Sequence, residues 1–237
     1  TMLKQNGEHY DKANAAYSVG GPETAVNMLN ENLDLNIQDY VSVNFLALAD
    51  VIDMVDGITV KLTDEEVVHM NNYCVETSKV TGKKYKKIEP AVAGTYKLNG
   101  VQAVSYARIR YTAGGDYKRT ERMRTVLTEV FNKAKKMSVA DLNNVLDKVL
   151  PEVYTNITKS DILALIPQIA SYSIVDSKGW PYETKGITLN GVWYGPPINL
   201  EKNVSQLHKE LFAQDDYVPT DKVKEISNKI IQKTGYR

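Results

Sequence analysis

Apolar positions alternate with polar ones in short stretches of the chain and recur at helical spacing in longer stretches. Residues 38–45 carry an apolar side chain at every second position, with Val41, Val43 and Phe45 on one side. This pattern predicts a half-buried strand. Apolar residues at helical spacing follow directly, and we expect Gly57 to end that helix because glycine readily adopts the left-handed conformation found at helix ends.

A second strand and a second helix are predicted for residues 58–82. Residues 58–62 read as a short strand. Thr63 and Glu66 then have the spacing of a capping box, in which each side chain accepts a hydrogen bond from the other residue's backbone. We expect this helix to end by Gly82. Strands and helices that alternate along a chain favour a layered α/β domain.

The second half of the chain is predicted to be mostly helical. A long helix is expected from Asp116, with one buried apolar stripe that consists of Met123, Leu127, Val130, Phe131 and Ala134. A tight hairpin turn is expected at residues 189–192, because Asn-Gly suits the positive φ angles of such turns. The other predicted helices begin near Pro22 and Asn99 or span residues 139–149, 160–172, 199–212 and 221–233.

Composition narrows the classes of protein. Of 237 residues, 43% are hydrophobic and 24% are charged, as in ordinary globular proteins. No linker-like stretch divides the chain, so we predict one domain over residues 1–237, with residues 216–237 as a terminal helix and tail. The 29 basic and 29 acidic residues balance, which argues against nucleic acid as a partner. Cys74 is the only cysteine, so no internal disulfide bond can form.

The most informative stretch is rich in arginine. Five arginines and one lysine fall within residues 108–124 of a chain without net charge. Arg108 and Arg110 are two residues apart, so an extended segment would direct both to one side. A glycine pair then permits a tight turn, and Arg119 is expected on the first turns of the next helix, where backbone N–H groups also attract anions. Because guanidinium groups suit phosphate oxygens, we interpret the stretch as a pyrophosphate or phosphodiester site.

A plainer interpretation fits the same stretch. Lys118, Glu121, Arg122 and Arg124 lie at spacings typical of salt bridges on a helix surface. The stretch could therefore be an exposed basic helix face without a ligand. The residues alone leave the two interpretations open.

Four segments of the chain resemble the LytR-CpsA-Psr family of extracytoplasmic cell-wall enzymes. The most specific are a Tyr-x-Arg-x-Arg motif at residues 106–110 and a Gly-Asp-x-x-Arg motif at residues 115–119. The other two are residues 11–23 and the stretch that leads from residues 40–45 to residues 56–60. Their order and spacing fit the family over most of the chain.

The resemblance implies an α/β fold with α-β-α layers, in which helices flank a central mixed β-sheet and a hydrophobic cleft accommodates a lipid. It implies a phosphotransferase that moves a glycopolymer, such as teichoic acid or capsule polysaccharide, from an undecaprenyl-pyrophosphate carrier to a peptidoglycan hydroxyl with the help of Mg2+. It also places the protein at the extracytoplasmic face of the membrane of a Gram-positive bacterium. An arginine cluster suits this reaction, because phosphoryl transfer depends on positioning and charge neutralisation.

Residue roles carry over by position in the motifs. The resemblance implies that Asp116 and Arg119 take part in catalysis, with Asp116 as an orienting group or a base. It further implies that the pyrophosphate is bound by Lys12, Arg108, Arg110, Arg119 and Arg122.

Two features depart from the family pattern. Met123 stands where the family often has glutamine, so one polar contact is lost or is supplied elsewhere. The family's magnesium-binding aspartates lie upstream of Thr1, so we expect no metal ligands in this chain. We therefore expect a piece of a longer protein, with its membrane-associating segment elsewhere and with a sheet edge that the upstream strands would cover.

Other functions and sites remain alternatives. A module could bind a polyprenyl pyrophosphate or an anionic glycan without turnover, and a transcriptional regulator is a third possibility. The basic loop at residues 82–87 could contact anionic lipid or could simply be solvated. Packing of the hairpin or a glycan groove would equally explain four aromatic residues, namely Trp180, Tyr182, Trp193 and Tyr194.

Overall fold

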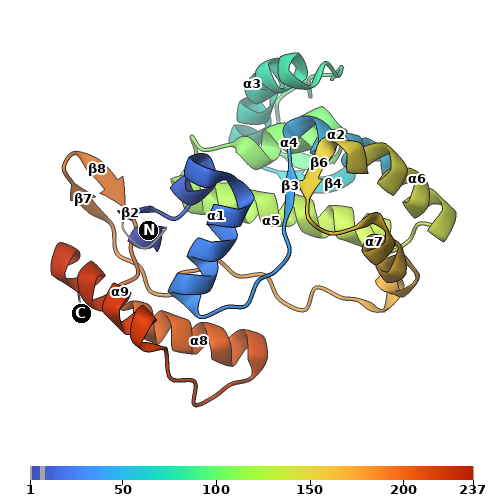
Figure 1. Cartoon of the computed structure of the whole chain (residues 1–237). Helices are drawn as coiled ribbons and strands as arrows, with labels where there is room; N and C mark the ends of the chain where they lie inside the picture. The colour runs from blue at the N-terminus through green and yellow to red at the C-terminus, as the bar shows by residue number, and fades with distance from the viewer. Residues whose placement is uncertain (1, 6–8, 237) are drawn as a thin grey trace. The chain divides into compact units, whose positions relative to one another are not determined.

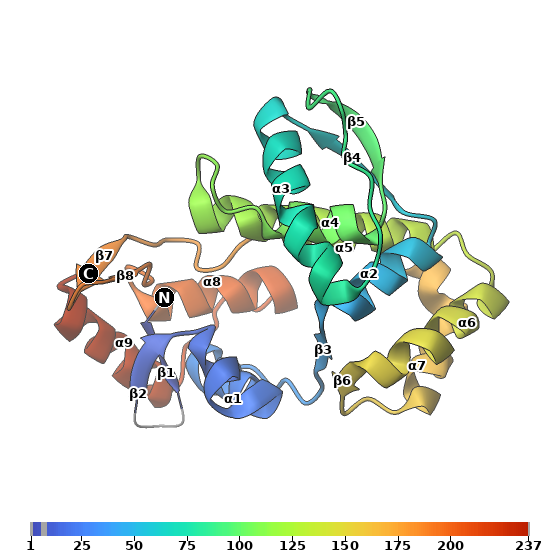
Figure 2. The same cartoon turned by 90° about the horizontal axis from the view of Figure 1, so that it is seen from above.

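The computed structural model of the chain describes residues 2–5 and 9–236, with side chains from Tyr10 onward. Its contacts divide the chain into two compact units. The central unit runs from Val41 to Gly179, and the terminal unit combines the residues up to Tyr40 with those from Trp180. Figures 1 and 2 show the elements of both units. The predicted single domain over residues 1–237 stays a prediction.

The central unit contains most of the helices. Local sequence signals fix several of their ends, as predicted. The elements of this unit are β3 (Val41–Val43), α2 (Phe45–Met54), β4 (Ile58–Leu62), α3 (Asp64–Thr81), β5 (Gly94–Leu98), α4 (Gly100–Arg108), α5 (Gly115–Ala134), α6 (Val139–Val149), β6 (Val153–Thr155) and α7 (Lys159–Leu165), with short 3-10 helices at Leu150–Glu152 and Ile166–Ser171.

Two capping boxes start the helices that position the candidate site. Thr63 and Glu66 exchange side-chain and backbone hydrogen bonds at the start of α3, which confirms the prediction. Asn99 and Gln102 do the same at the start of α4. Each box satisfies backbone N–H groups that a helix start would otherwise leave without a partner.

Helix α4 forms the centre of the core of this unit. Every residue from Gly100 to Ala107 is buried, and the helix packs against α2, α3 and α5 (Figure 2). Ile58 and Leu98 from the β4–β5 pair complete the core around it. A helix buried on all sides holds its two ends firmly, so the residues that follow Arg108 start from a fixed position.

The terminal unit packs three helices around a second core. Its elements are β1 (Met2–Gln5), β2 (His9–Lys12), α1 (Ala15–Leu33), β7 (Ile187–Leu189), β8 (Val192–Tyr194), α8 (Leu200–Phe212) and α9 (Asp221–Thr234). Helix α1 has non-helical angles at Gly20 and Gly21, where φ is 73° at Gly21, so the predicted helix start at Pro22 is found as a kink inside a longer helix.

The hairpin of the terminal unit bears on whether four aromatic residues pack in a core or line a glycan groove. Asn190 and Gly191 have φ angles of 50° and 77°, as the predicted tight turn requires. Three of the four aromatic residues considered for a glycan groove (Trp180, Tyr182 and Tyr194) pack against the core formed by α1, α8 and α9. Trp193, in contrast, is an exposed residue on the hairpin.

The strands pair only in twos. Among the described residues, the four ladders β1–β2, β3–β6, β4–β5 and β7–β8 are each two-stranded and antiparallel. The α/β class is confirmed, but the predicted central mixed sheet is not what these residues form. The alternation of strands and helices did not reveal that β5 returns antiparallel to β4 although α3 lies between them.

The strand predicted at residues 38–45 is shorter and more exposed than expected. Asn44 caps α2 by accepting a hydrogen bond from the backbone of Ala47 at 2.8 Å, so Phe45 begins a helix. Val41 and Val43 are 58% and 48% exposed, so the prediction of a half-buried strand was wrong. Alternation alone does not reveal whether a second layer covers a strand.

No helix among the described residues combines the length and the apolar character that crossing a lipid bilayer requires.

Candidate functional site

The chain reverses direction between α4 and α5 through the predicted glycine pair. Gly114 has a φ of 92° and caps α5, and Gly115 has a φ of 49°. The Gly115 N–H donates to the carbonyl of Thr112 at 3.1 Å and closes the turn. Such angles are strained for residues with a Cβ atom. The turn therefore brings the start of α5 back to the residues that follow α4.

Arg110, Asp116 and Arg119 meet at this turn and form what we call the arginine cluster. Arg110 holds the Asp116 carboxylate with two hydrogen bonds, Nε to Oδ1 at 3.0 Å and Nη2 to Oδ2 at 3.2 Å. Nη2 of Arg119 lies 3.3 Å from the same Oδ1 atom. One carboxylate thus contacts two guanidinium groups, and the two-pronged pairing fixes the orientation of the Arg110 guanidinium.

The arginine cluster keeps capacity for a further anion. Two guanidinium groups and one carboxylate leave one positive charge, and the side chains of Arg110 and Asp116 are about half exposed. Nε of Arg119 is buried without a hydrogen-bond partner among the described residues. A buried donor without a partner is costly unless a ligand or water satisfies it. The cluster also sits at the positive end of the α5 dipole, which favours negative charge.

An exposed apolar stripe follows the cluster along the same face of α5. Met123 is four residues beyond Arg119 and Leu127 is four beyond Met123, and these two side chains are 41% and 57% exposed. The predicted buried stripe through Met123 and Leu127 was therefore wrong. The buried residues of α5 are Arg122 and Val126, so the helix is rotated relative to the prediction.

Arg122 faces the interior of the central unit. Each of its three nitrogen atoms has a partner: Nε donates to Glu66 at 2.9 Å, Nη1 to the carbonyl of Ile109 at 3.1 Å, and Nη2 to Oγ1 of Thr112 at 2.7 Å. Only 4% of Arg122 is exposed. The hydrophobic pattern placed Arg122 on a polar face, because pattern analysis cannot know that an arginine has an acid from a distant part of the chain as its partner. Its contact with a pyrophosphate stays a prediction.

Arg108 ends α4 and turns toward α3. It donates to Thr77 at 2.9 Å and to Glu76 at 2.7 Å, and its guanidinium lies 4.6 Å from the ring centroid of Phe45. The prediction that Arg108 and Arg110 share an extended segment was wrong, because the capping box starts a helix that continues through Arg108. The two arginines therefore have different partners.

Lys12 belongs to the terminal unit. It is the last residue of β2, and its Nζ atom lies 5.5 Å from the ring centroid of Tyr194. Its predicted role near the phosphates stays a prediction, as do the catalytic roles of Asp116 and Arg119.

The sequence did not reveal the acids and hydroxyls that hold the arginines. Glu66 lies 56 residues before Arg122, and Glu76 and Thr77 lie 32 and 31 residues before Arg108. The capping-box pattern did identify Glu66, but it does not predict which residue pairs with its second carboxylate oxygen.

Tyr106 lies beside the Glu66–Arg122 pair. Burial and the nearby Glu66 charge, partly opposed by Arg122, raise the pKa of Tyr106 to about 12.

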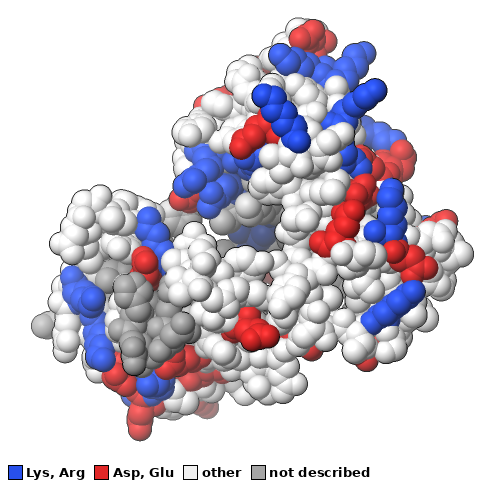
Figure 3. All heavy atoms as spheres, turned by 45° about the horizontal axis from the view of Figure 1, so that its top comes forward, with Lys and Arg blue, Asp and Glu red and all other residues white. Residues whose placement is uncertain are grey.

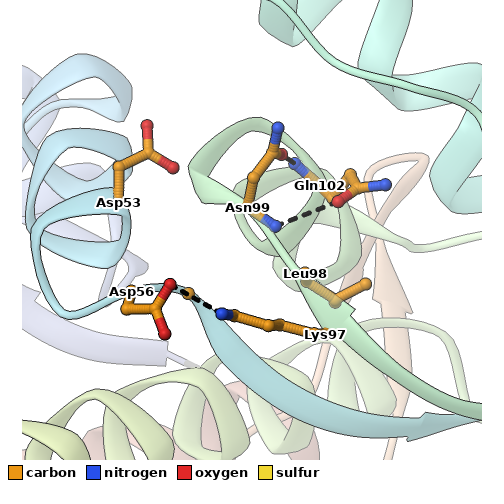
Figure 4. A pocket seen from close by; sticks show the side chains of 7 residues that line it. Asp53, Asp56, Lys97, Leu98, Asn99 and Gln102 are labelled. Atoms are coloured by element: carbon orange, nitrogen blue, oxygen red, sulfur yellow. Dashed lines mark hydrogen bonds and ion pairs between the residues drawn. The ribbon is translucent and has the colours of Figure 1, made fainter.

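Two cavities of the central unit are lined mainly by charged and polar residues other than Arg110, Asp116 and Arg119. One, of about 270 Å³, lies at the opposite end of α4 and is lined by Asp53, Asp56, Lys97 and Gln102, among others (Figure 4). The other, of about 250 Å³, includes Arg124 on a different face of α5. Neither has the apolar lining expected of a lipid cleft, so that cleft stays a prediction.

The basic loop of residues 82–87 is partly engaged by acids. Nζ of Lys83 lies 2.5 Å from Asp50 and 2.8 Å from Asp53.

Among the described residues, no group of three or more histidine, cysteine, aspartate or glutamate side chains could hold a metal ion.

Comparison with known protein families assigns the chain. The model of the LytR_cpsA_psr family matches residues 1–212. The chain belongs to the LytR-CpsA-Psr family. Its predicted family is thus confirmed, and the site motifs at residues 106–119 fall within the matched range.

Curated relatives carry both enzyme and regulator names. The chain is 34% identical to the biofilm regulatory protein A of Streptococcus mutans serotype c (strain ATCC 700610 / UA159), over 78% of this chain and 44% of that protein. It is 32% identical to the polyisoprenyl-teichoic acid–peptidoglycan teichoic acid transferase TagV of Bacillus subtilis (strain 168), over 88% of this chain and 51% of TagV. The chain therefore spans about half the length of these relatives.

Solved structures share the fold. A crystal structure of an Enterococcus faecalis protein described as a transcriptional regulator matches with a TM-score of 0.71 and 26% identity, over 98% of this chain and 79% of that one. B. subtilis TagV matches with a TM-score of 0.66 and 26% identity, over 92% of this chain and 81% of that one.

Proposed function

We propose that the complete protein is a phosphotransferase of the cell wall. It moves an anionic glycopolymer (teichoic acid, capsule or another wall polysaccharide) from an undecaprenyl-pyrophosphate carrier to a peptidoglycan hydroxyl. Several relatives in the family are named as teichoic acid transferases that use a polyisoprenyl-linked donor and peptidoglycan. The same names support a place of action at the extracytoplasmic face of a Gram-positive membrane.

One observation carries the proposal for this chain. A charged group of two arginines and one aspartate is followed, on the same helix face, by the exposed apolar side chains of Met123 and Leu127. A polyprenyl pyrophosphate has the same order of parts, a multiply charged head and an apolar tail. Surface salt bridges alone would not explain why an apolar stripe continues from the charged group into solvent.

The chemistry follows from this placement. The acceptor hydroxyl attacks the sugar-linked phosphorus, the bond from that phosphorus to the lipid phosphate breaks, and the hydroxyl proton passes to water. Arg110 and Arg119 bind the pyrophosphate and neutralise the charge that grows on the departing lipid phosphate. Asp116 holds the two guanidinium groups in line. Mg2+ belongs to the proposal for the complete protein only, because both Asp116 oxygens already accept hydrogen bonds from Arg110 and the described residues contain no fitting ligand group.

Calorimetric binding of a short polyprenyl pyrophosphate tests the site, with the matching polyprenyl alcohol as the control ligand and with and without Mg2+. The test variant is Arg110→Gln/Arg119→Gln, and the matched control is Arg124→Gln, an arginine on another face of the same helix. We expect binding that needs the pyrophosphate, is lost in the double variant and persists in the control. Equal binding by all three proteins would refute the assignment of the site.

Because some relatives are named as regulators, binding to duplex DNA should also be measured. A DNA-binding regulator would bind duplex DNA with an affinity that falls steeply as salt rises. Figure 3 shows basic and acidic side chains interspersed on the face it displays, and the net charge is zero. We therefore expect no salt-sensitive binding to duplex DNA. A non-catalytic module is distinguished by turnover, since only the enzyme would release lipid phosphate from a lipid-linked polymer.

A further inference from the structure

We propose that Glu66, Arg122 and Thr112 are positioning residues, which set the loop of residues 109–114 so that Arg110 can reach Asp116. The chain of contacts begins at the start of α3 and ends beside the arginine cluster. The inference rests on the proposed function of the cluster, but it concerns residues whose side chains hold the loop in place.

Glu66 is the fixed end of this chain of contacts. Its Oε2 atom accepts the backbone N–H of Thr63 at 3.0 Å, and the Thr63 hydroxyl accepts the backbone N–H of Glu66 at 3.2 Å. Its Oε1 atom accepts from Nε of Arg122 at 2.9 Å. The capping box thus immobilises the carboxylate, because a side chain held by its own helix start has little freedom left. Arg122 meets an acid whose position α3 already determines.

Arg122 holds the loop at two points that flank Arg110. One nitrogen donates to the carbonyl of Ile109, directly before Arg110, and another to the hydroxyl of Thr112, two residues after it. The Thr112 carbonyl in turn accepts the N–H of Gly115 at the start of α5. The backbone that carries Arg110 is therefore fixed on both sides.

The burial of Arg122 explains why the arrangement is specific. The residue is almost completely buried, and its guanidinium lies 6.0 Å from the ring centroid of Tyr106. In such a setting each donor needs a partner, and an alternative loop conformation would leave a buried N–H without one. Buried ion pairs contribute little net stability compared with apolar packing, but they discriminate between conformations in some proteins. Arg122 selects the loop conformation in which Arg110 pairs with Asp116.

Thr112→Val is the cleanest test, because valine has the same shape and removes only the hydroxyl. Thr112→Ser restores a hydroxyl, and Thr120→Val is the matched control, since the Thr120 hydroxyl donates only to the carbonyl of Tyr117 within α5. The first readout needs no ligand: NMR hydrogen exchange of the Arg110 Nε–H, which donates to Asp116. We expect faster exchange in Thr112→Val, and wild-type exchange in Thr112→Ser and Thr120→Val.

The second readout is affinity for a short polyprenyl pyrophosphate. We expect Thr112→Val to weaken binding about fivefold, the order of one hydrogen bond. In double variants the loss should vanish when Arg110→Gln is already present, because the hydroxyl acts through Arg110. It should persist in full beside Arg119→Gln. Glu66→Gln, which keeps an acceptor for the capping box, should act in the same direction as Thr112→Val.

The outcomes separate this inference from the proposed function. Unchanged Arg110 exchange in a folded Thr112→Val protein overturns the inference, even if the cluster binds the pyrophosphate. A loss of affinity that adds to that of Arg110→Gln overturns it as well. Faster Arg110 exchange in a protein that binds no pyrophosphate supports the positioning role and refutes the proposed function.

Discussion

The two sides of helix α5 carry the same kinds of side chain in opposite settings. On the inner side Arg122 and Val126 are buried, and each nitrogen of Arg122 has a partner. On the outer side Arg119 and Leu127 reach the surface, and Nε of Arg119 has no hydrogen-bond partner among the described residues. The difference teaches that the partners of an arginine, and not its residue type, decide whether it is buried in the core or lies at the surface.

This contrast also separates architecture from function along the arginine-rich stretch. Arg108 and Arg122 connect α4 and α5 to acids and hydroxyls of α3 and the loop. Arg110 and Arg119 share one carboxylate at the surface of the central unit. Structural partners account for Arg108 and Arg122, and the interpretation as a ligand site stays a prediction for Arg110 and Arg119.

The largest effect should come from the inner arginine. Arg122→Met removes the charged partner of the partly buried Glu66 carboxylate, and breaking such an ion pair should lower the free energy of unfolding by about 3 kcal/mol. Arg119→Met should cost about 1 kcal/mol or less, because its pair with Asp116 is partly solvated. Denaturant unfolding followed by circular dichroism measures both. Equal losses would contradict the distinction between the two sides.

A smaller effect should distinguish the apolar residues of the two sides. Val126→Ala deletes two buried methyl groups and should lower the free energy of unfolding by about 2 kcal/mol. Leu127→Ala should change it by less than about 0.5 kcal/mol, because the side chain is mostly exposed. Leu127→Ala should instead weaken binding of a polyprenyl pyrophosphate and leave binding of inorganic pyrophosphate unchanged. A tail-independent loss would mean that the outer stripe does not hold the lipid.

How far the sequence predicts this site depends on the distance between partners. Local signals worked: the capping box at Thr63 and the turn at Gly114 each involve residues a few positions apart. The inner face of α5 was predicted wrongly, because hydrophobic patterning treats an arginine as a surface residue. The carboxylate that makes burial of Arg122 tolerable lies 56 residues away.

The prediction of a central mixed sheet was wrong for a related reason. A strand such as residues 58–62 can be read from the sequence, but its neighbour cannot, because pairing joins segments far apart in the chain. The predicted central sheet rested on the alternation of strands with helices. That alternation is equally compatible with β4 and β5 pairing antiparallel across α3.

A still smaller effect concerns pH and the inner side. The pKa of Tyr106 is raised to about 12, mainly by burial and then by the Glu66 charge. In the unfolded chain this tyrosine ionises near pH 10. Its contribution to the free energy of unfolding is therefore fully present below pH 10 and is lost as the pH rises through about 12. At pH 11 the loss is about 1 kcal/mol. Tyr106→Phe should remove this part of the pH dependence, which unfolding curves at pH 9 and pH 11 would show. An identical pH dependence in the variant would contradict the burial argument.

The smallest effect should come from the exposed pair at the start of α5. Nζ of Lys118 lies 2.9 Å from Glu121, and both side chains are about half exposed. Water screens such a pair, and ordering two long side chains costs entropy, so Lys118→Ala should change the free energy of unfolding by no more than about 0.5 kcal/mol. The same variant should also leave pyrophosphate affinity within about twofold of wild type at moderate salt, because Lys118 contacts neither Arg110 nor Asp116. A tenfold loss of affinity would place Lys118 in the ligand site and would extend the outer side of α5 beyond the arginine cluster.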